Sequence, residues 1–344
     1  MAFALTLILA GALLSGCESG LSLKGASSSD GEASVSFEAM DTYMTITVYG
    51  ENAEEAAEAA QEEIERLDEI LGAEEEGCGI YEINAAGGGT LSDEAAYLVK
   101  ASIDLWQETE GAFDITIYPA AELWGFTTGN YCVPSDAEIA RVLALVGTDM
   151  LEYDEGSAQL TLKEGMAIGL GGIAKGYSGD RLMEIFEEYG VSGAIASLGG
   201  NIAVYGQKPS GDLWNIAIQD PDDSSSYICV LSLSGNVSVV TSGGYERYFE
   251  EDGATYHHII DPETGCPADT SLTSVSIISG DGTSADGLST ALFVMGLDEA
   301  VQFWQTNTAY DFEMVLVDED GNVYISEGLA DSYSSDYDVT IISK

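Results

Sequence analysis

A series of short, β-branched segments between residues 193 and 280 limits the folds open to this chain of 344 residues. Gly or Asp/Pro turns bound each segment, which is typical of consecutive strands. Helix-like segments come before the series: an Ala/Glu-rich one at 52–71, one from Ser92 to about Glu110, and one from about Ser135. Helices followed mainly by strands favour an α+β fold over a regular βαβ alternation.

The segment "GLGGIAKGYSGD" at 169–180 raises a competing interpretation. Its Gly169, Gly171 and Ala174 fit the dinucleotide fingerprint G-x-G-x-x-G/A, and a helix-like stretch follows at 181–189. In a Rossmann domain, however, the fingerprint follows the first strand of an alternating βα series. Here it lies in the middle of an α+β pattern, which argues against a Rossmann turn.

Asp286 and Thr290 stand four residues apart in "SADGLSTALFVMG", a helix expected over Ser284–Gly296 and followed by another from about Asp298. This spacing puts a carboxylate and a hydroxyl on one helix face, and both are oxygen ligands suited to Mg²⁺. The competing reading is structural: an acid favoured by the helix dipole and a Thr bonded to its own helix. Spacing alone favours the structural reading. The segment 312–326 is expected to close the chain as a hairpin.

His257 and His258 are the only histidines in the chain. They fall in an expected strand over 254–261, where successive side chains point to opposite faces. At most one of them should therefore face any given site. Histidine is the side chain most easily poised as a base near neutral pH, although a lone histidine often has only a structural role.

The balance of 10 basic and 60 acidic residues gives a formal net charge of −50. Such a chain is not expected to bind nucleic acid, because phosphate backbones are bound by Lys/Arg surfaces. An anionic ligand would have to be held by a local source of positive charge, such as a metal ion, a helix N-terminus or one of the few lysines.

The N-terminal residues 1–16 resemble a lipoprotein signal peptide, with an apolar run too short to span a bilayer. Leu14-Ser15-Gly16-Cys17 resembles a lipobox, which would make Cys17 the lipidated residue. An uncleaved anchor or a buried terminal helix is the alternative. Residues 17–34 are small and polar and are expected to be a flexible tether, and the folded domain is expected over 35–344. The other cysteines are too widely spaced to predict a zinc site or a pairing.

Several segments, taken in order, closely resemble the FAD:protein FMN transferase (ApbE) family over roughly residues 37–305. They are Met40-Asp41-Thr42, Gly111-Ala112-Phe113-Asp114, residues 169–180, "TSGGYERYF", "YHHIIDPETGCPA" and "ADGLSTALFVMG". Three places differ from the usual family pattern. Asp41 replaces a Gly, Gly169 replaces the Asp of an Asp-Leu-Gly, and "GAEEEGCGI", before "EINAAGG", keeps little of the usual Ser/aromatic pattern. The resemblance implies one domain of mixed, largely antiparallel sheet with flanking helices.

The resemblance also implies a chemistry. Family members bind FAD with Mg²⁺, cleave its pyrophosphate and attach FMN through a phosphoester to a Thr or Ser of a target protein, releasing AMP. It implies that Asp286, Thr290 and a backbone carbonyl at Gly172 bind the metal, and that Lys175 lies beside the FAD phosphates. The FAD-contacting positions that it implies are Met40, Ala112, Phe113, Asp114, Gly169, His258 and Ile260. His258 is the candidate base for the incoming hydroxyl, and Asp114 is the second choice.

The leading hypothesis is therefore a lipid-anchored, Mg²⁺-dependent flavin transferase on the extracytoplasmic face of a bacterial membrane, acting on membrane or exported redox subunits. Two alternatives remain open. One is a metal-dependent FAD pyrophosphatase that uses water and yields FMN and AMP. The other is a non-catalytic flavin-binding lipoprotein.

Overall fold

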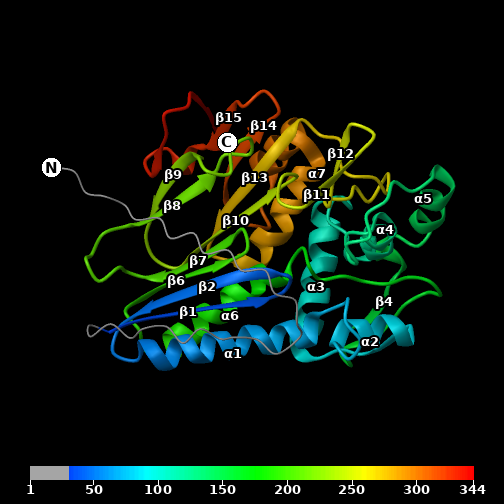
Figure 1. Cartoon of the computed structure of the whole chain (residues 1–344), viewed down its shortest axis with the longest axis horizontal. Coiled ribbons are helices and arrows are strands. Elements are labelled where there is room, and N and C mark those ends of the chain that lie inside the picture. Colours follow the sequence, from blue (N-terminus) through cyan, green and yellow to red (C-terminus); the bar gives the residue numbers. More distant parts are fainter. Residues whose placement is uncertain (1–30) are drawn as a thin grey trace, which may run out of the picture.

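The computed structural model describes residues 31–344 (Figure 1). Their largest sheet has nine strands in the order β1-β2-β6-β7-β10-β13-β14-β15-β17. The strands are β1 (Glu32–Ala39), β2 (Thr42–Tyr49), β6 (Gly193–Leu198), β7 (Asn201–Gly206), β10 (Val237–Gly243), β13 (Leu272–Ser279), β14 (Glu313–Asp318), β15 (Val323–Ser326) and β17 (Val339–Ile342). Neighbouring strands are antiparallel except β15 and β17, which are parallel. The expected α+β fold with a mixed, largely antiparallel sheet is confirmed.

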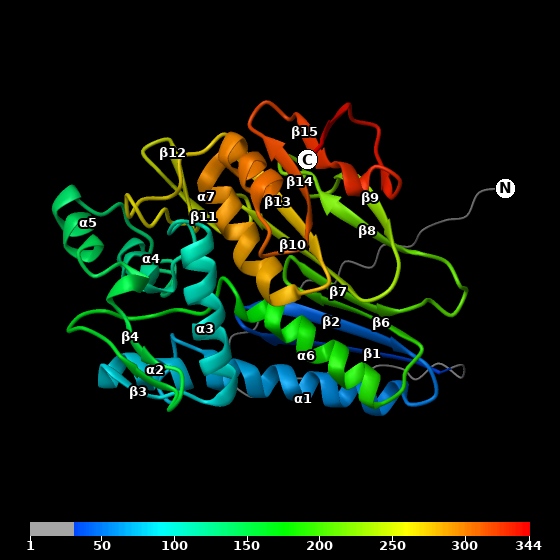
Figure 2. The same ribbon diagram turned by 180° about the vertical axis from the view of Figure 1, so that it is seen from behind.

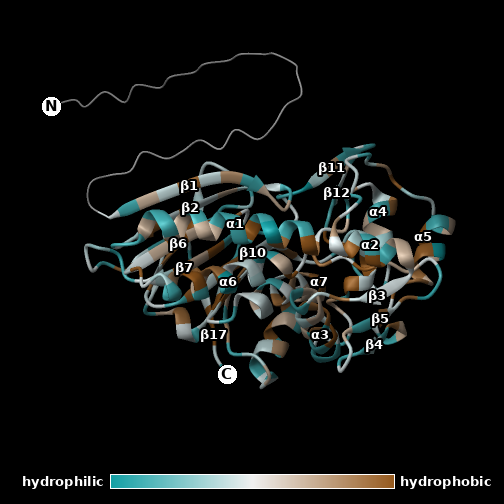
Figure 3. Ribbon diagram, turned by 90° about the horizontal axis from the view of Figure 1, so that it is seen from below, coloured by the Kyte–Doolittle hydropathy of each residue, from teal (hydrophilic) through white to brown (hydrophobic). Residues whose placement is uncertain are grey.

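Three long helices cover one face of this sheet: α1 (Ala53–Leu71), α6 (Ala174–Glu188) and α7 (Gly282–Thr306) (Figure 2). Apolar residues at helical spacing bury the inner side of α1, where Ala56 and Ala60 allow close packing on β1 and β2. Its outer side is acidic, and in Figure 3 hydrophilic residues are prominent along it. The two expected C-terminal helices form one element, α7, with a kink at Gly296, where φ is 76°.

A smaller sheet covers the opposite face. It contains β16 (Tyr333–Ser334), β9 (Tyr227–Leu233) and β8 (Trp214–Gln219). Alternation along β10 divides the two cores: Val239 packs toward this small sheet, whereas Val240 packs toward α7.

The remaining helices and strands lie around these three helices and the sheets. The helices are α2 (Gly79–Ala86), α3 (Asp93–Glu108), α4 (Tyr118–Trp124) and α5 (Asp136–Leu143), with 3₁₀ turns η1 (Ile115–Ile117), η2 (Thr148–Met150) and, nearer the C-terminus, η3 (Glu327–Leu329). The strands are β3 (Gly88–Thr90), β4 (Glu152–Asp154), β5 (Gln159–Thr161) and a hairpin of β11 (Tyr248–Glu251) and β12 (Ala254–His257). Ser92 caps α3 as expected, and α5 starts after Ser135, which forms a capping box with Glu138.

Four boundaries differ from expectation. The helix after the glycine segment begins at Ala174, so only residues 169–173 form a loop. The expected strand 254–261 ends at His257, and β16 and β17 follow the hairpin that was expected to close the chain. Residues 32–34 of the expected tether belong to β1, where Ser34 forms a hydroxyl–hydroxyl bond of 3.1 Å with Thr47 of β2. Small polar residues can thus form a strand when a partner strand satisfies their hydrogen bonds.

The expected signal peptide at 1–16 and Cys17 lie outside the described residues. Within residues 31–344, no helix is both long enough and apolar enough to cross a membrane. The four cysteines of this part are free thiols.

Candidate functional site

The first feature of the site is a close contact between α6 and α7. The Gly176 amide of α6 donates a hydrogen bond of 2.8 Å to Asp286 Oδ2, and the Asp286 side chain is buried. A Cβ at Gly176 would overlap the Gly282 carbonyl oxygen and lie 2.7 Å from Asp286 Cβ. Glycine at 176 therefore allows the two helices to meet and places the Asp286 carboxylate at the start of α6.

Thr290 and the glycine loop meet beside this contact. A Cβ at Gly172 would lie 3.8 Å from Thr290 Oγ1 and 3.2 Å from the ring of Phe113. The hydroxyl that bonds back to its own helix is that of Ser289, which donates to the Asp286 carbonyl at 2.8 Å. Thr290 Oγ1 has only a long 3.4 Å contact with Ser242 Oγ. The structure thus brings together Gly172, Asp286 and Thr290, the three positions that sequence resemblance implied for a metal.

This oxygen set fits Mg²⁺. Among the hydrogen bonds of residues 31–344, none reaches Asp286 Oδ1, and the helix start is capped by a different acid, Asp281, which accepts from the Ser284 amide. The described residues contain no group of three His, Cys, Asp or Glu side chains that could hold a metal ion. The donor set here is instead one carboxylate, one hydroxyl and backbone carbonyls, and Mg²⁺ commonly takes one or two protein carboxylates.

Lys175 provides a positive charge at the same place. It is the second residue of α6, is partly exposed, and its Nζ lies 3.5 Å from the Gly171 carbonyl oxygen. The N-terminus of α6 adds the partial positive charge of a helix dipole. Together they supply the local positive charge that an anionic ligand needs in a chain with a net charge of −50.

The two histidines point in different directions, as expected. His257 Nε2 lies 3.1 Å from the Ala268 carbonyl oxygen, and its ring packs edge-on against Phe293. His258 Nδ1 lies 3.2 Å from the Arg247 carbonyl oxygen. A carbonyl only accepts hydrogen bonds, so the proton is on Nδ1 and Nε2 remains an acceptor. Burial, with the positive charges of Arg247 and Lys175, lowers the pKa of His258 to about 3.

The Asp114 carboxylate accepts hydrogen bonds from neighbouring residues of the fold. Its Oδ1 accepts from the Thr116 amide at 2.8 Å and from the hydroxyls of Thr116 and Thr148, and its Oδ2 accepts from the Thr148 amide at 3.0 Å. These bonds cap η1 and tie it to η2. The geometry therefore favours a positioning role for Asp114 and gives no support to its use as a base.

The other positions implied by resemblance have separate surroundings. Met40 has a left-handed φ of 49°, and its amide donates to Asp68 Oδ2 at 3.0 Å. Phe113 is buried beneath Gly172, with the half-buried Ala112 beside it. The Ile260 side chain packs in a separate apolar cluster with Trp124 and Phe126, so only its backbone could face a ligand.

Sequence reasoning missed Glu246 of "TSGGYERYF". Its carboxylate packs on the β6–β7 turn, where a Cβ at Gly200 would lie 2.9 Å from Glu246 Oε1. The residue as a whole is exposed, and its carboxylate lies against Gly200. Desolvation raises its pKa to about 7, with Lys175 opposing and the Asp286 carboxylate adding to the rise. The motif was visible, but no spacing rule connects it to Asp286.

Asn84 of "EINAAGG" was also missed. Its amide donates to the Ile168 carbonyl at 2.8 Å and accepts from the Ile168 amide at 2.9 Å. This pair of bonds fixes the chain just before Gly169. A side chain that bonds both groups of a distant residue's backbone leaves no periodic signal in the sequence.

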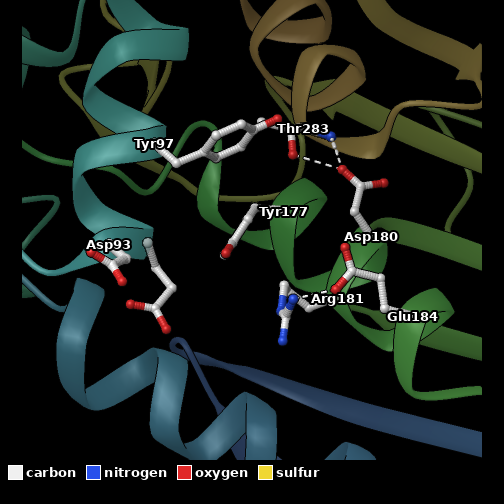
Figure 4. A pocket seen from close by; sticks show the side chains of 8 residues that line it. Asp93, Tyr97, Tyr177, Asp180, Arg181, Glu184 and Thr283 are labelled. Carbon is white, nitrogen blue, oxygen red and sulfur yellow. Dashed lines mark hydrogen bonds and ion pairs between the residues drawn. The ribbon is translucent and has the colours of Figure 1, made fainter. Parts of the chain in front are cut away.

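A cavity of about 420 Å³ lies elsewhere, between α3, α6 and the start of α7 (Figure 4). Its lining residues are Asp93, Glu94, Tyr97, Tyr177, Asp180, Arg181, Glu184 and Thr283. None of them is a predicted site residue. Asp180 uses its carboxylate to accept hydrogen bonds from the Gly282 and Thr283 amides, so this side of α6 holds the start of α7 in place.

The chain is similar in sequence to a known protein family. The model of the ApbE family matches residues 40–315. A FAD:protein FMN transferase of Klebsiella pneumoniae is 32% identical over 268 residues, covering 76% of this chain and 82% of that protein. One of Treponema pallidum is 30% identical over 313 residues, covering 84% and 85%.

Solved structures give the same result. The crystal structure of an ApbE protein from Thermotoga maritima has a TM-score of 0.81 and 35% identity, covering 88% of this chain and 99% of that one. The apo form of the Pseudomonas stutzeri flavinyl transferase ApbE has a TM-score of 0.75 and 28% identity, covering 89% and 95%.

Proposed function

The chain belongs to the ApbE family, and we propose that it is a FAD:protein FMN transferase that depends on Mg²⁺ and modifies a Thr or Ser hydroxyl of a target protein. In this reaction the hydroxyl oxygen bonds to the phosphorus of the FMN half of FAD. The bond from that phosphorus to the bridging oxygen breaks, and AMP leaves. The hydroxyl proton passes to a base.

One observation carries the proposal: Asp286, Thr290 and the glycine loop converge beside Lys175 in a chain that is otherwise strongly acidic. A pyrophosphate needs positive charge, and few other groups here supply it. We propose that Asp286 Oδ1, Thr290 Oγ1 and the Gly172 carbonyl hold Mg²⁺. The ion would neutralise charge on the phosphate oxygens, and Lys175 with the α6 N-terminus would orient them.

We assign the base to His258. Its Nδ1 proton is fixed on the Arg247 carbonyl oxygen, so Nε2 can take the hydroxyl proton. Its low pKa keeps the accepting form fully populated at neutral pH. The rings of Phe126 and His258 pack edge to face, with a centroid separation of 6.4 Å.

The test uses the purified chain, FAD and Mg²⁺ with a candidate acceptor domain, followed by mass spectrometry of that domain. We expect an FMN-sized adduct on a Thr or Ser, together with stoichiometric AMP. Free FMN formed at the same rate without acceptor would instead identify a FAD pyrophosphatase. Tight FAD binding with no AMP in any arm would identify a non-catalytic flavin-binding protein and reject both enzymes.

We further propose that Cys17 is lipidated and holds the enzyme on the extracytoplasmic face of a bacterial membrane. There it would act on membrane or exported redox subunits. The support is the lipobox-like Leu14-Ser15-Gly16-Cys17 before a polar segment and the first strand. Incorporation of labelled palmitate into the parent chain and not into Cys17→Ser, with release of the variant from the membrane fraction, would test it. Equal labelling of both would reject the site.

A further inference from the structure

The ring of Tyr118 lies against the start of the glycine loop and has no role in the mechanism above. Tyr118 begins α4, directly after the 3₁₀ turn that Asp114 caps. Its hydroxyl donates a hydrogen bond of 2.9 Å to the Ala73 carbonyl, which fixes the ring, and the side chain stays partly accessible. Burial and the charge of Glu74 raise the pKa of Tyr118 to about 12, so the ring is uncharged at neutral pH.

Gly169 has no side chain, and the Tyr118 ring occupies the space that one would need. A Cβ at Gly169 would lie 2.6 Å from Tyr118 Cδ2 and 3.3 Å from Cγ. The Gly169 amide donates to the Ile115 carbonyl at 2.9 Å, which holds the loop against the turn before Tyr118. Gly169 does not have a left-handed φ, so its backbone conformation does not require glycine. The requirement is the space that the ring occupies.

The ring also lies at a suitable distance from the phosphate site. Gly172, which packs beside Thr290, is three residues after Gly169, so the two are at most about 11 Å apart. The ribitol or ribose that joins a phosphate to its ring in FAD spans a gap of this order. Phe113, the other aromatic residue at the loop, is buried under Gly172 and Gly287 and has no open face.

We propose that Tyr118 stacks on one of the two flat heteroaromatic rings of FAD, and that Gly169 leaves the space for this contact. The inference rests on the proposed function, because it assigns a binding residue for the same substrate. An uncharged aromatic surface suits this chain, since it adds affinity for an anionic dinucleotide without any further positive charge.

The test compares Tyr118→Phe with Tyr118→Ala by titrating each with FAD, FMN and AMP in the presence of Mg²⁺. We expect the Ala variant to bind FAD roughly tenfold or more weakly, and the Phe variant to stay within about threefold of the parent, because stacking needs only the ring. A matching loss for FMN identifies the isoalloxazine as the stacked ring, and one for AMP identifies adenine. Unchanged FAD affinity in the Ala variant, or equal losses in both variants, would overturn the proposal.

Two further measurements separate stacking from misfolding. Inorganic pyrophosphate with Mg²⁺ has no ring, so Tyr118→Ala should bind it as the parent does. Gly169→Ala should weaken FAD binding by pushing the ring from the loop side, whereas Tyr227→Ala, which removes an exposed ring on β9 of the small sheet, should not. A parent chain that fails to bind FAD rejects the proposed function. If the parent binds FAD and Tyr118→Ala binds it equally well, only the role of Tyr118 is rejected.

Discussion

At the scale of single residues, Asp286 and Thr290 can bind a ligand only if neighbouring residues do not already use their side-chain oxygens. The sequence spacing fitted both a metal site and an ordinary helix start. In the structure Asp281 caps α7 and Ser289 bonds back along it, so the structural roles belong to other residues. Asp286 Oδ1 and Thr290 Oγ1 are thereby left for a ligand.

The first prediction concerns Asp286→Asn. The amide keeps an oxygen for the Gly176 N–H but removes the negative charge, so the fold should survive and Mg²⁺ affinity should fall. We expect turnover to drop by roughly 100-fold or more, since a metal supplies several kcal/mol of charge stabilisation. Calorimetric titration with Mg²⁺ and AMP release are the measurements. Asp298→Asn, on an exposed part of the same helix, is the matched control. Full activity in Asp286→Asn would remove the metal assignment.

The histidine pair provides the second prediction. His258→Gln should lower kcat by roughly 100-fold or more, because the proton acceptor is lost. His257→Gln, whose parent ring packs on Phe293, should retain turnover. With the pKa of His258 near 3, the part of the kcat/KM profile that depends on His258 should fall only below about pH 5. A fall centred near pH 6.5 that His258→Gln abolishes would contradict this environment.

Asp114 illustrates what residue patterns cannot reveal. Its motif marked it for attention, but whether it is free or bonded depends on Thr148, which is 34 residues away. The same holds for Glu246, whose neighbours Gly200, Lys175 and Asp286 come from three separate elements. The sequence identifies chemically capable residues, whereas tertiary contacts decide which of them remain available.

At the scale of elements, the α6–α7 contact holds the site together, and Gly176 provides the third prediction. In Gly176→Ala the new methyl group would overlap the Gly282 carbonyl, so the helices must separate. Overpacking of this kind costs about 1–3 kcal/mol, and the Gly176 bond to Asp286 should weaken with it. Urea unfolding and Mg²⁺ binding measure the two effects. Gly280→Ala, with no atom beyond its chain neighbours within 4 Å of its Cβ, should change neither.

Asp180 gives a fourth prediction that depends on pH. Burial raises its pKa from 3.8 to about 6, although bonds from Gly282 and Thr283 oppose the rise. A raised carboxyl pKa means that the folded state holds the proton more tightly than the unfolded one. The resulting stability is complete below about pH 4 and is lost as pH rises through 6.

The measurement compares the free energy of unfolding of the parent with that of Asp180→Asn from pH 4 to pH 8. The difference, parent minus variant, should fall by up to about 3 kcal/mol, while the titration of the many other acids cancels. A difference that stays constant, or one that grows with pH, would show that the bonds from α7 outweigh burial at this carboxyl.

Elements were predictable where they repeat a period over enough residues. The alternation of β6, β7 and β10 and the spacing along α1 were sufficient, because one face of each is buried. The short helices α2 and α4 gave no comparable pattern. The end of β12 at His257 was missed because it depends on the partner strand: β11 begins only at Tyr248, so the His258 amide bond to the Arg247 carbonyl is the last in register.

At the scale of the whole molecule, charge decides how the enzyme can work. With 60 acidic and 10 basic residues, the surface repels anions, and Lys175 and the helix ends act against that field. The described ion pairs lie mostly at the surface and include carboxylates such as Glu94, paired with Arg66 at 2.6 Å. Such pairs contribute little each, so the net repulsion remains largely uncompensated.

The last prediction follows from this repulsion. Raising NaCl from low concentration to 1 M shortens the screening length from about 30 Å at 0.01 M to about 3 Å, so the melting temperature should rise steadily. A triple variant, Glu54→Gln, Glu58→Gln and Glu62→Gln, removes three exposed charges from the outer side of α1 without touching the site. It should melt higher than the parent at low salt and converge with it at 1 M, because screening then already removes the repulsion that the substitutions relieve. Parallel curves with a constant offset would instead mean that the glutamines act through helix propensity, and that self-repulsion does not limit the stability of this fold.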